Sequence, residues 1–174
     1  MRTRITEMTG VEFPIFAFTH CRDVVAAVTN AGGMGVLGAV AHSPEQLEVD
    51  LTWIRERVGR RPFGVDLLIP RKYAGSVEGG LERADLRKMH PDEHRQWIDA
   101  LLERYGVPPM PGSEAAERGD RTLAIDPKSM APLIDVAYEH GISLFASALG
   151  SPPEWLIERS RKEGVPVAAL AGRL

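Results

Sequence analysis

The sequence is poor in the features that mark secreted, membrane and nucleic-acid-binding proteins. It has one cysteine, Cys21, among 174 residues, so an internal disulfide is excluded and a reducing compartment is favoured. The formal net charge of -3 provides no basic surface for nucleic acid or an anionic membrane. No apolar run approaches transmembrane length, and the basic N-terminus lacks the apolar core of a signal peptide. These absences predict a cytoplasmic protein with neither nucleic acid nor membrane as a partner.

Motifs of hydrolytic chemistry are missing or incomplete. No G-x-S-x-G nucleophile elbow occurs. His90, Glu93 and His94 match the H-x-x-E-H zinc string, but Pro91 favours the start of a helix and so places His90 outside it. Cys21 is adjacent to a histidine in sequence, and adjacent residues do not need to face each other. We therefore expect no metal site and no thiolate nucleophile.

The most informative motif is NAGGMGVLGA, Asn30–Ala39. Gly33, Gly35 and Gly38 form a literal G-x-G-x-x-G. In dinucleotide-binding proteins these glycines follow a strand and open a helix, so that the helix N-terminus meets the pyrophosphate. Here they follow the helical pattern of Asp23–Ala31 and lead into a short apolar run. The order predicts a closely packed helix-to-strand turn and not a nucleotide site.

The rest of the chain repeats this arrangement of helix, glycine and apolar run. Pairs typical of capping boxes, Ser43 with Gln46 and Ser151 with Glu154, mark two helix starts. Gly32 fits the left-handed position after a helix. Apolar runs without strict alternation are typical of buried parallel strands. Five such runs are present: 14–18, 36–39, 63–69, 142–148 and 165–171. The pattern predicts an α/β fold of parallel βα repeats.

An insertion at about 71–125 interrupts the repeats. It contains many charges, the proline-rich GVPPMPG and one predicted helix, Pro91–Tyr105, with Trp97, Ile98, Leu101 and Leu102 facing inward. Because it follows a strand, we expect it at the sheet edge where α/β enzymes bind ligands, in the role of a lid. A solvated insertion without a chemical role is the alternative.

Asp66 and His20 are the candidate site residues. Asp66 lies at the centre of an otherwise apolar strand, where an isolated carboxylate is costly, so we expect a hydrogen-bond partner for it. His20 follows the first predicted strand, at the edge where parallel α/β proteins place their chemistry. A structural pairing of Asp66 with backbone or an arginine, and an ordinary loop histidine, are the alternatives.

Several segments resemble the nitronate monooxygenase family in order and spacing. They are PIFAF (14–18), NAGGMGVLGA, the helix with Glu45, Gln46 and Leu47, and PFGVDLLIP (62–70). The resemblance implies an FMN-dependent TIM barrel, an oxidoreductase that oxidises alkyl nitronates or related small molecules with O2.

The resemblance also implies where the cofactor lies. Phe18, Thr19 and His20 would lie against the flavin ring. His20 is also our catalytic candidate, because of its position after the first predicted strand. Asp66 would occupy a strand position whose usual asparagine contacts the cofactor. Ser147 and Gly172 would line the same pocket. The family often has Gln-Ala-Pro-Met after the first strand, where this chain has AFTH.

Five predicted strands are fewer than the eight of a TIM barrel, whose phosphate site is commonly built from the loops after strands 7 and 8. We therefore expect residues 1–174 to form the N-terminal part of a truncated barrel. The resemblance places the family's Gly-rich segment and active-site histidine beyond Leu174, so we expect the isolated chain to be inactive. Its unpaired sheet edges favour self-association. A flavin-dependent enoyl reductase and a non-catalytic α/β interaction module are the alternatives.

Overall fold

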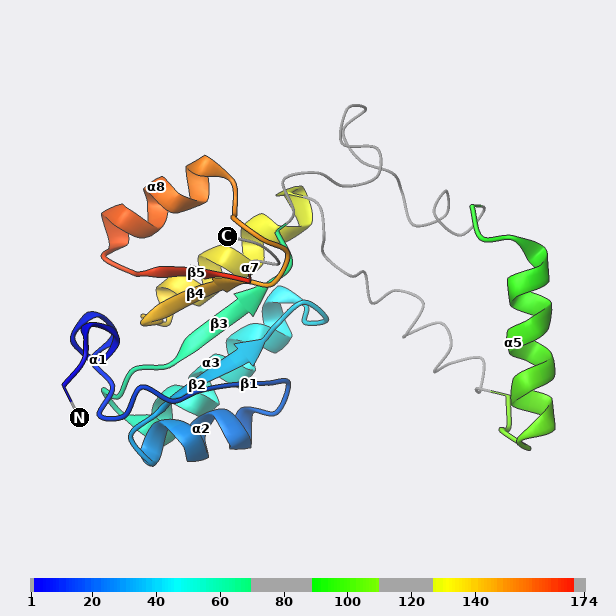
Figure 1. Ribbon diagram of the computed structural model, residues 1–174, viewed down its shortest axis with the longest axis horizontal. Helices are drawn as coiled ribbons and strands as arrows, with labels where there is room; N and C mark the ends of the chain where they lie inside the picture. Colours follow the sequence, from blue (N-terminus) through cyan, green and yellow to red (C-terminus); the bar gives the residue numbers. More distant parts are fainter. Residues whose placement is uncertain (1, 70–88, 110–126, 171–174) are drawn as a thin grey trace. The chain divides into compact units, whose positions relative to one another are not determined.

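The computed structural model describes residues 2–69, 89–109 and 127–170 (Figure 1). The chain divides into two compact units. The first comprises Met1–Arg71 and Leu123–Leu174, and the second is Lys72–Thr122. Within the described ranges, no helix combines the length and the apolar character needed to cross a membrane.

The first unit is built on a five-stranded parallel sheet. The strands are β1 (Phe16–Thr19), β2 (Met34–Gly38), β3 (Gly64–Leu67), β4 (Leu144–Ser147) and β5 (Val167–Ala169). Their order in the sheet, β1-β2-β3-β4-β5, is their order in the chain (Figure 1). A doubly wound sheet reverses its strand order, whereas successive strands of a TIM barrel do not. The predicted parallel βα repeats are therefore confirmed, with the strand order of a barrel.

Helices alternate with these strands. They are α2 (Arg22–Asn30), α3 (Pro44–Val58), α7 (Pro127–Glu139) and α8 (Glu154–Glu163). The predicted capping box of α3 is formed: the Ser43 hydroxyl accepts from the Gln46 backbone N–H at 3.2 Å, and the Gln46 side chain accepts in return at 3.1 Å. The box predicted before α8 is wrong, because Pro153 occupies the N-cap and makes no side-chain cap hydrogen bond. A short helix, α1 (Arg4–Thr9), precedes the sheet and was not predicted.

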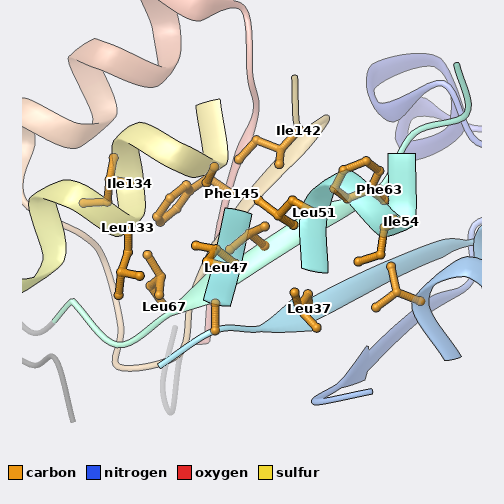
Figure 2. Packing of buried hydrophobic residues seen from close by; sticks show 14 of the residues in the cluster. Leu37, Leu47, Leu51, Ile54, Phe63, Leu67, Leu133, Ile134, Ile142 and Phe145 are labelled. Carbon is orange, nitrogen blue, oxygen red and sulfur yellow. The ribbon is translucent and has the colours of Figure 1, made fainter. Parts of the chain in front are cut away.

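One large core lies between the sheet and these four helices, on what we call the outer face. It joins side chains from α2, α3, α7 and α8 to Leu37, Val65, Leu67 and Phe145 of the strands. Figure 2 shows Leu47 and Leu51 of α3 packed among Leu37, Leu67 and Phe145. Each fully buried side chain of this size contributes about 1.5–3 kcal/mol. The outer face is thus the main source of stability of this unit.

The opposite, inner face carries a much smaller cluster. Met34, Val36 and Leu144 are buried there together with Val11, which follows α1. Phe16 and Phe18 also belong to this face by register, yet they are 41% and 58% exposed. Among the described residues, the helices of the βα repeats therefore cover one face of the sheet and leave the other partly open.

The glycine-rich stretch forms the predicted helix-to-strand turn between α2 and β2. Gly32 has a φ of 90°, which is the left-handed conformation expected after a helix. Gly35 allows close packing: a Cβ at this position would lie 2.5 Å from the Val25 carbonyl oxygen. The glycines thus serve the contact of α2 with the sheet, as the order of elements predicted.

In the second unit the structure describes the predicted helix as α5 (Asp92–Arg104). The helix begins after Pro91, so His90 lies outside it, as predicted. Of the four side chains predicted to face inward, Leu101 is half-buried, whereas Trp97 is 65% exposed and Ile98 and Leu102 are exposed too. The other residues of the insertion, 71–88 and 110–125, lie outside the described ranges, and its role as a lid stays a prediction.

Candidate functional site

The candidate site lies at the carboxyl ends of β1, β2 and β3. His20 directly follows β1, and its Nδ1 lies 2.9 Å from the carbonyl oxygen of Gly38 at the end of β2. A carbonyl oxygen only accepts, so Nδ1 carries the hydrogen of this bond. The Phe18 ring meets the imidazole edge to face, with centroids 5.0 Å apart and planes at 82°. These two contacts fix the orientation of the imidazole.

Gly38 supports both rings because it has no side chain. A Cβ at this position would lie 2.7 Å from Phe18 Cζ and 2.7 Å from His20 Cε1. Any other residue would therefore displace one or both rings. The sequence predicted a closely packed glycine here but not this contact, which depends on how β1 pairs with β2.

Asp66 of β3 lies beside this group on the inner face. It is the register partner of Gly38, so the two positions share a face of the sheet. Asp66 is 8% exposed, and burial raises the pKa of its carboxyl to about 6, an effect that the charge of His20 partly offsets. Among the described residues, no group donates a hydrogen bond to this carboxylate. The predicted partner is thus not found there, and the carboxyl has a raised pKa instead.

The surroundings of Asp66 explain the raised pKa. Its neighbour in β4 is Ala146, which packs against the buried inner-face cluster of Met34, Val36 and Leu144. An ionised carboxylate loses hydration against such a wall without gaining hydrogen bonds. A carboxyl and an imidazole beside an apolar wall suit a partly apolar ligand that presents N–H or O–H donors along one edge.

The remaining predicted site residues are not part of this group. The Thr19 hydroxyl accepts a hydrogen bond from the Cys21 backbone N–H at 3.0 Å, within the link from β1 to α2. Ser147 is fully buried, pairs with Leu67 on the outer face and donates to the Gly150 carbonyl at 2.7 Å. Gly172 lies outside the described residues. The structure therefore brings together Phe18, His20 and Asp66, and places Ser147 on the opposite face of the sheet.

Sequence reasoning missed a second polar cluster, on the helix side of the sheet. Asp50 of α3 accepts from Arg22 Nη1 of α2 at 2.9 Å and lies 3.0 Å from His42 Nε2. His42 stands in the link between β2 and α3, and its Nδ1 is buried with no hydrogen-bond partner in the described part of the chain. Arg22 also lies over the Trp53 ring. The cluster joins α2, α3 and the loop that precedes α3, so no short sequence motif could have indicated it.

The structure defines a protein of parallel βα repeats with barrel-type strand order and with its candidate site at the carboxyl ends of the strands. The family model described as nitronate monooxygenase matches residues 2–100. The chain belongs to the nitronate monooxygenase family.

Individual relatives agree with this assignment. A Mycobacterium tuberculosis (strain ATCC 25618 / H37Rv) protein named as a candidate monooxygenase is 54% identical over 172 residues, which cover 99% of this chain and 46% of the relative. A Staphylococcus saprophyticus protein named as a candidate nitronate monooxygenase is 24% identical over 176 residues, covering 98% of this chain and 43% of the relative. The chain thus spans less than half the length of these relatives.

A solved structure confirms the fold. The chain is similar to the crystal structure of a nitroalkane oxidase from Streptomyces ansochromogenes with a TM-score of 0.66 at 19% sequence identity. The similarity covers 97% of this chain and 42% of the oxidase. The α/β fold of parallel βα repeats is therefore shared with that part of the oxidase.

Proposed function

We propose that this chain forms the N-terminal part of an FMN-dependent oxidoreductase that oxidises alkyl nitronates with O2. Membership of the nitronate monooxygenase family supports the class of reaction. The observation that carries the proposal is the Asp66 carboxyl, which lies beside His20 on an apolar wall and receives no hydrogen bond from the described residues. A buried carboxyl that receives no hydrogen bond from the protein is suited to a ligand that donates one.

The residues at this edge fit the ring of FMN. The isoalloxazine ring is planar and largely apolar, with an N–H group between two carbonyls on its polar edge. We assign the Asp66 carboxylate to that N–H and the exposed Phe18 ring to the flat surface of the cofactor. When bound, FMN would supply the electron transfer of the reaction. Thr19, Ser147 and Gly172 stay predictions as further cofactor contacts.

His20 is our candidate for the contact with substrate. A nitronate is an anion, and an ionised Asp66 repels it. A positive charge on the imidazole would offset that repulsion, because the charge of His20 also lowers the pKa of Asp66. The chain would thus separate two tasks between neighbouring groups: Asp66 accepts from the cofactor, and His20 orients the substrate.

We further propose that the 174 residues alone bind FMN weakly and turn over no nitronate. The chain spans 46% of the length of the M. tuberculosis relative. In TIM barrels, the phosphate of a ligand is commonly held by the loops after strands 7 and 8. The five strands of the structure would then provide contacts to the ring but not to the phosphate.

The proposal is tested with protein from the complete reading frame that contains these residues. FMN is titrated and followed by flavin fluorescence, and O2 consumption is measured with an alkyl nitronate. Burial raises the pKa of Asp66 to about 6, so we expect a contribution of its ionised carboxylate to FMN affinity that increases as the pH rises through this range, and we expect Asp66→Asn to remove that contribution, leaving only the pH dependence of the FMN phosphate. Asp135→Asn is the matched control, because Asp135 pairs with Arg159 on the surface of α7 and α8.

Two results would contradict the proposed function. Failure of the complete protein to bind FMN favours a non-catalytic module. Reduction of an enoyl thioester with a nicotinamide donor, without nitronate oxidation, favours the enoyl reductase.

A further inference from the structure

Three histidines of the first unit differ in the hydrogen bonds of their ring nitrogens. His140 engages both, with Nδ1 2.9 Å from the Val136 carbonyl oxygen and Nε2 3.1 Å from the Thr52 hydroxyl. His42 engages Nε2, which lies 3.0 Å from Asp50, while its Nδ1 is buried. His20 engages Nδ1 with Gly38, and its Nε2 has no hydrogen-bond partner among the described residues. His20 is also exposed.

We infer that the Gly38 carbonyl holds His20 in the Nδ1-protonated tautomer, so that Nε2 is the atom that His20 offers to a ligand. Gly38 is then a positioning residue with two tasks. Its carbonyl selects the tautomer. Its missing side chain leaves room for the imidazole and for the Phe18 ring that packs against it.

The tautomer determines which ligand groups His20 can bind. A neutral imidazole with its hydrogen on Nδ1 presents an acceptor at Nε2 and therefore binds a ligand N–H or O–H. A protonated imidazole presents a donor at the same atom and therefore binds an anionic oxygen. The identity of that ligand as a nitronate rests on the proposed function, but the tautomer does not.

The tautomer can be measured on the 174-residue chain without any ligand. The chain is labelled with ¹⁵N-histidine, and long-range ¹H–¹⁵N correlation spectra are recorded above the titration range of the imidazoles. His→Gln variants assign the five histidines. We expect His20 to show a protonated Nδ1 and a deprotonated Nε2. His42 serves as an internal reference of the opposite tautomer, because its Nε2 faces Asp50.

Gly38→Ala tests the positioning role. We expect the His20 nitrogen shifts to move toward the averaged values of an unrestrained imidazole, with the His42 and His140 shifts unchanged. A His20 that keeps its Nδ1-protonated pattern in this variant would contradict the need for glycine. The spectrum of the parent chain decides the tautomer by itself, even if the variant does not fold. A protonated Nε2, or averaged shifts, in the parent would overturn the inference.

A second measurement tests whether Nε2 is accessible. Diethylpyrocarbonate acylates unprotonated imidazole nitrogens, and mass spectrometry locates the modified residues. We expect His20 to react faster than His42 and His140, whose nitrogens are bonded or buried. A His20 that reacts more slowly than these two would overturn the inference. Neither measurement uses FMN, so a failure of the proposed function would leave both results interpretable.

Discussion

The two faces of the five-stranded sheet differ in what covers them and in which residues they carry. The outer face packs against four helices and buries large side chains such as Leu51 and Phe145 completely. The inner face has a small apolar cluster around Met34, and it also carries Asp66 and the exposed Phe18. Stability is therefore concentrated on the outer face, whereas the candidate site lies on the inner face. Substitutions of the candidate site residues should therefore leave the main core intact.

The largest expected effect is a difference in stability between alanine variants of two phenylalanines on opposite faces of the sheet. Phe145→Ala removes a fully buried ring that stacks on Tyr138 and should lower the free energy of unfolding by about 3–5 kcal/mol. Phe18→Ala removes a ring that is 58% exposed, and should cost about 1 kcal/mol or less, as surface substitutions do. Urea unfolding of both variants measures the difference. Equal losses would show that the inner face contributes as much stability as the outer face.

The next effect is the pH dependence that Asp66 gives to the free energy of unfolding. The folded pKa, about 6, lies above the ordinary value of 3.8, so this group stabilises the fold below pH 4, and that contribution is lost as the pH rises through 6. The loss is on the order of 2–3 kcal/mol, since one pKa unit corresponds to about 1.4 kcal/mol.

Unfolding free energies of the parent and of Asp66→Asn, measured from pH 4 to pH 8, test this effect. The decrease with rising pH should be smaller in the variant. Asp135→Asn, which changes a surface carboxylate, should keep the decrease of the parent. An identical pH profile for the parent and Asp66→Asn would show that the carboxyl is hydrated in the folded chain.

A matched pair of glycines on β2 gives a smaller effect. A Cβ at Gly35 meets backbone atoms of Val25, which cannot move away, so Gly35→Ala should cost about 1–3 kcal/mol. A Cβ at Gly38 meets the ends of two side chains, which can rotate, so Gly38→Ala should cost less. Thermal unfolding compares them, and NAD(H) binding should be absent in the parent and both variants. A larger loss for Gly38→Ala would show that the rings of Phe18 and His20 cannot move away from the added methyl group.

The smallest expected effect is weak self-association of the 174-residue chain. Strands β1 and β5 have no partner on their outer edges among the described residues, and Phe16, Phe18 and Leu170 are exposed beside them. Such edges favour pairing between chains. Sedimentation over a concentration series should show an increase in average mass, and Phe18→Ser should reduce it. A monomer at every concentration would contradict this prediction.

Much of the fold could be predicted because local patterns determine it. The order of helix, glycine and apolar run gave the βα repeats, and Ser43 with Gln46 gave the start of α3. Helix α1 was missed because RITEMT is short and has no apolar period. Ser151 has the right spacing to Glu154, but Pro152 and Pro153 move the helix start past it. Local sequence therefore determined elements well and their ends less well.

The candidate site was less predictable because it depends on which face each strand residue occupies. Asp66 was evident as an acid within an apolar strand, and His20 as a residue at a strand end. An apolar run such as LFAS shows no alternation, so it does not indicate that Ser147 lies on the outer face. The Gly38 contact with His20 arises from residues 18 apart in sequence. Such contacts follow from strand pairing, which a single sequence does not specify.

The short link between β1 and α2 has a consequence for ligand binding. Only His20 and Cys21 separate the strand from the helix, and Thr19 already holds the Cys21 N–H. Helix α2 packs closely against β2 because Gly35 has no side chain to separate them. The backbone at His20 is therefore held in place by the short link and by the packing of α2 before any ligand binds. Immobilising a side chain on binding costs about 0.5–1.5 kcal/mol, and a ligand that contacts His20 avoids most of this entropic cost. A small ligand can therefore be recognised with few contacts.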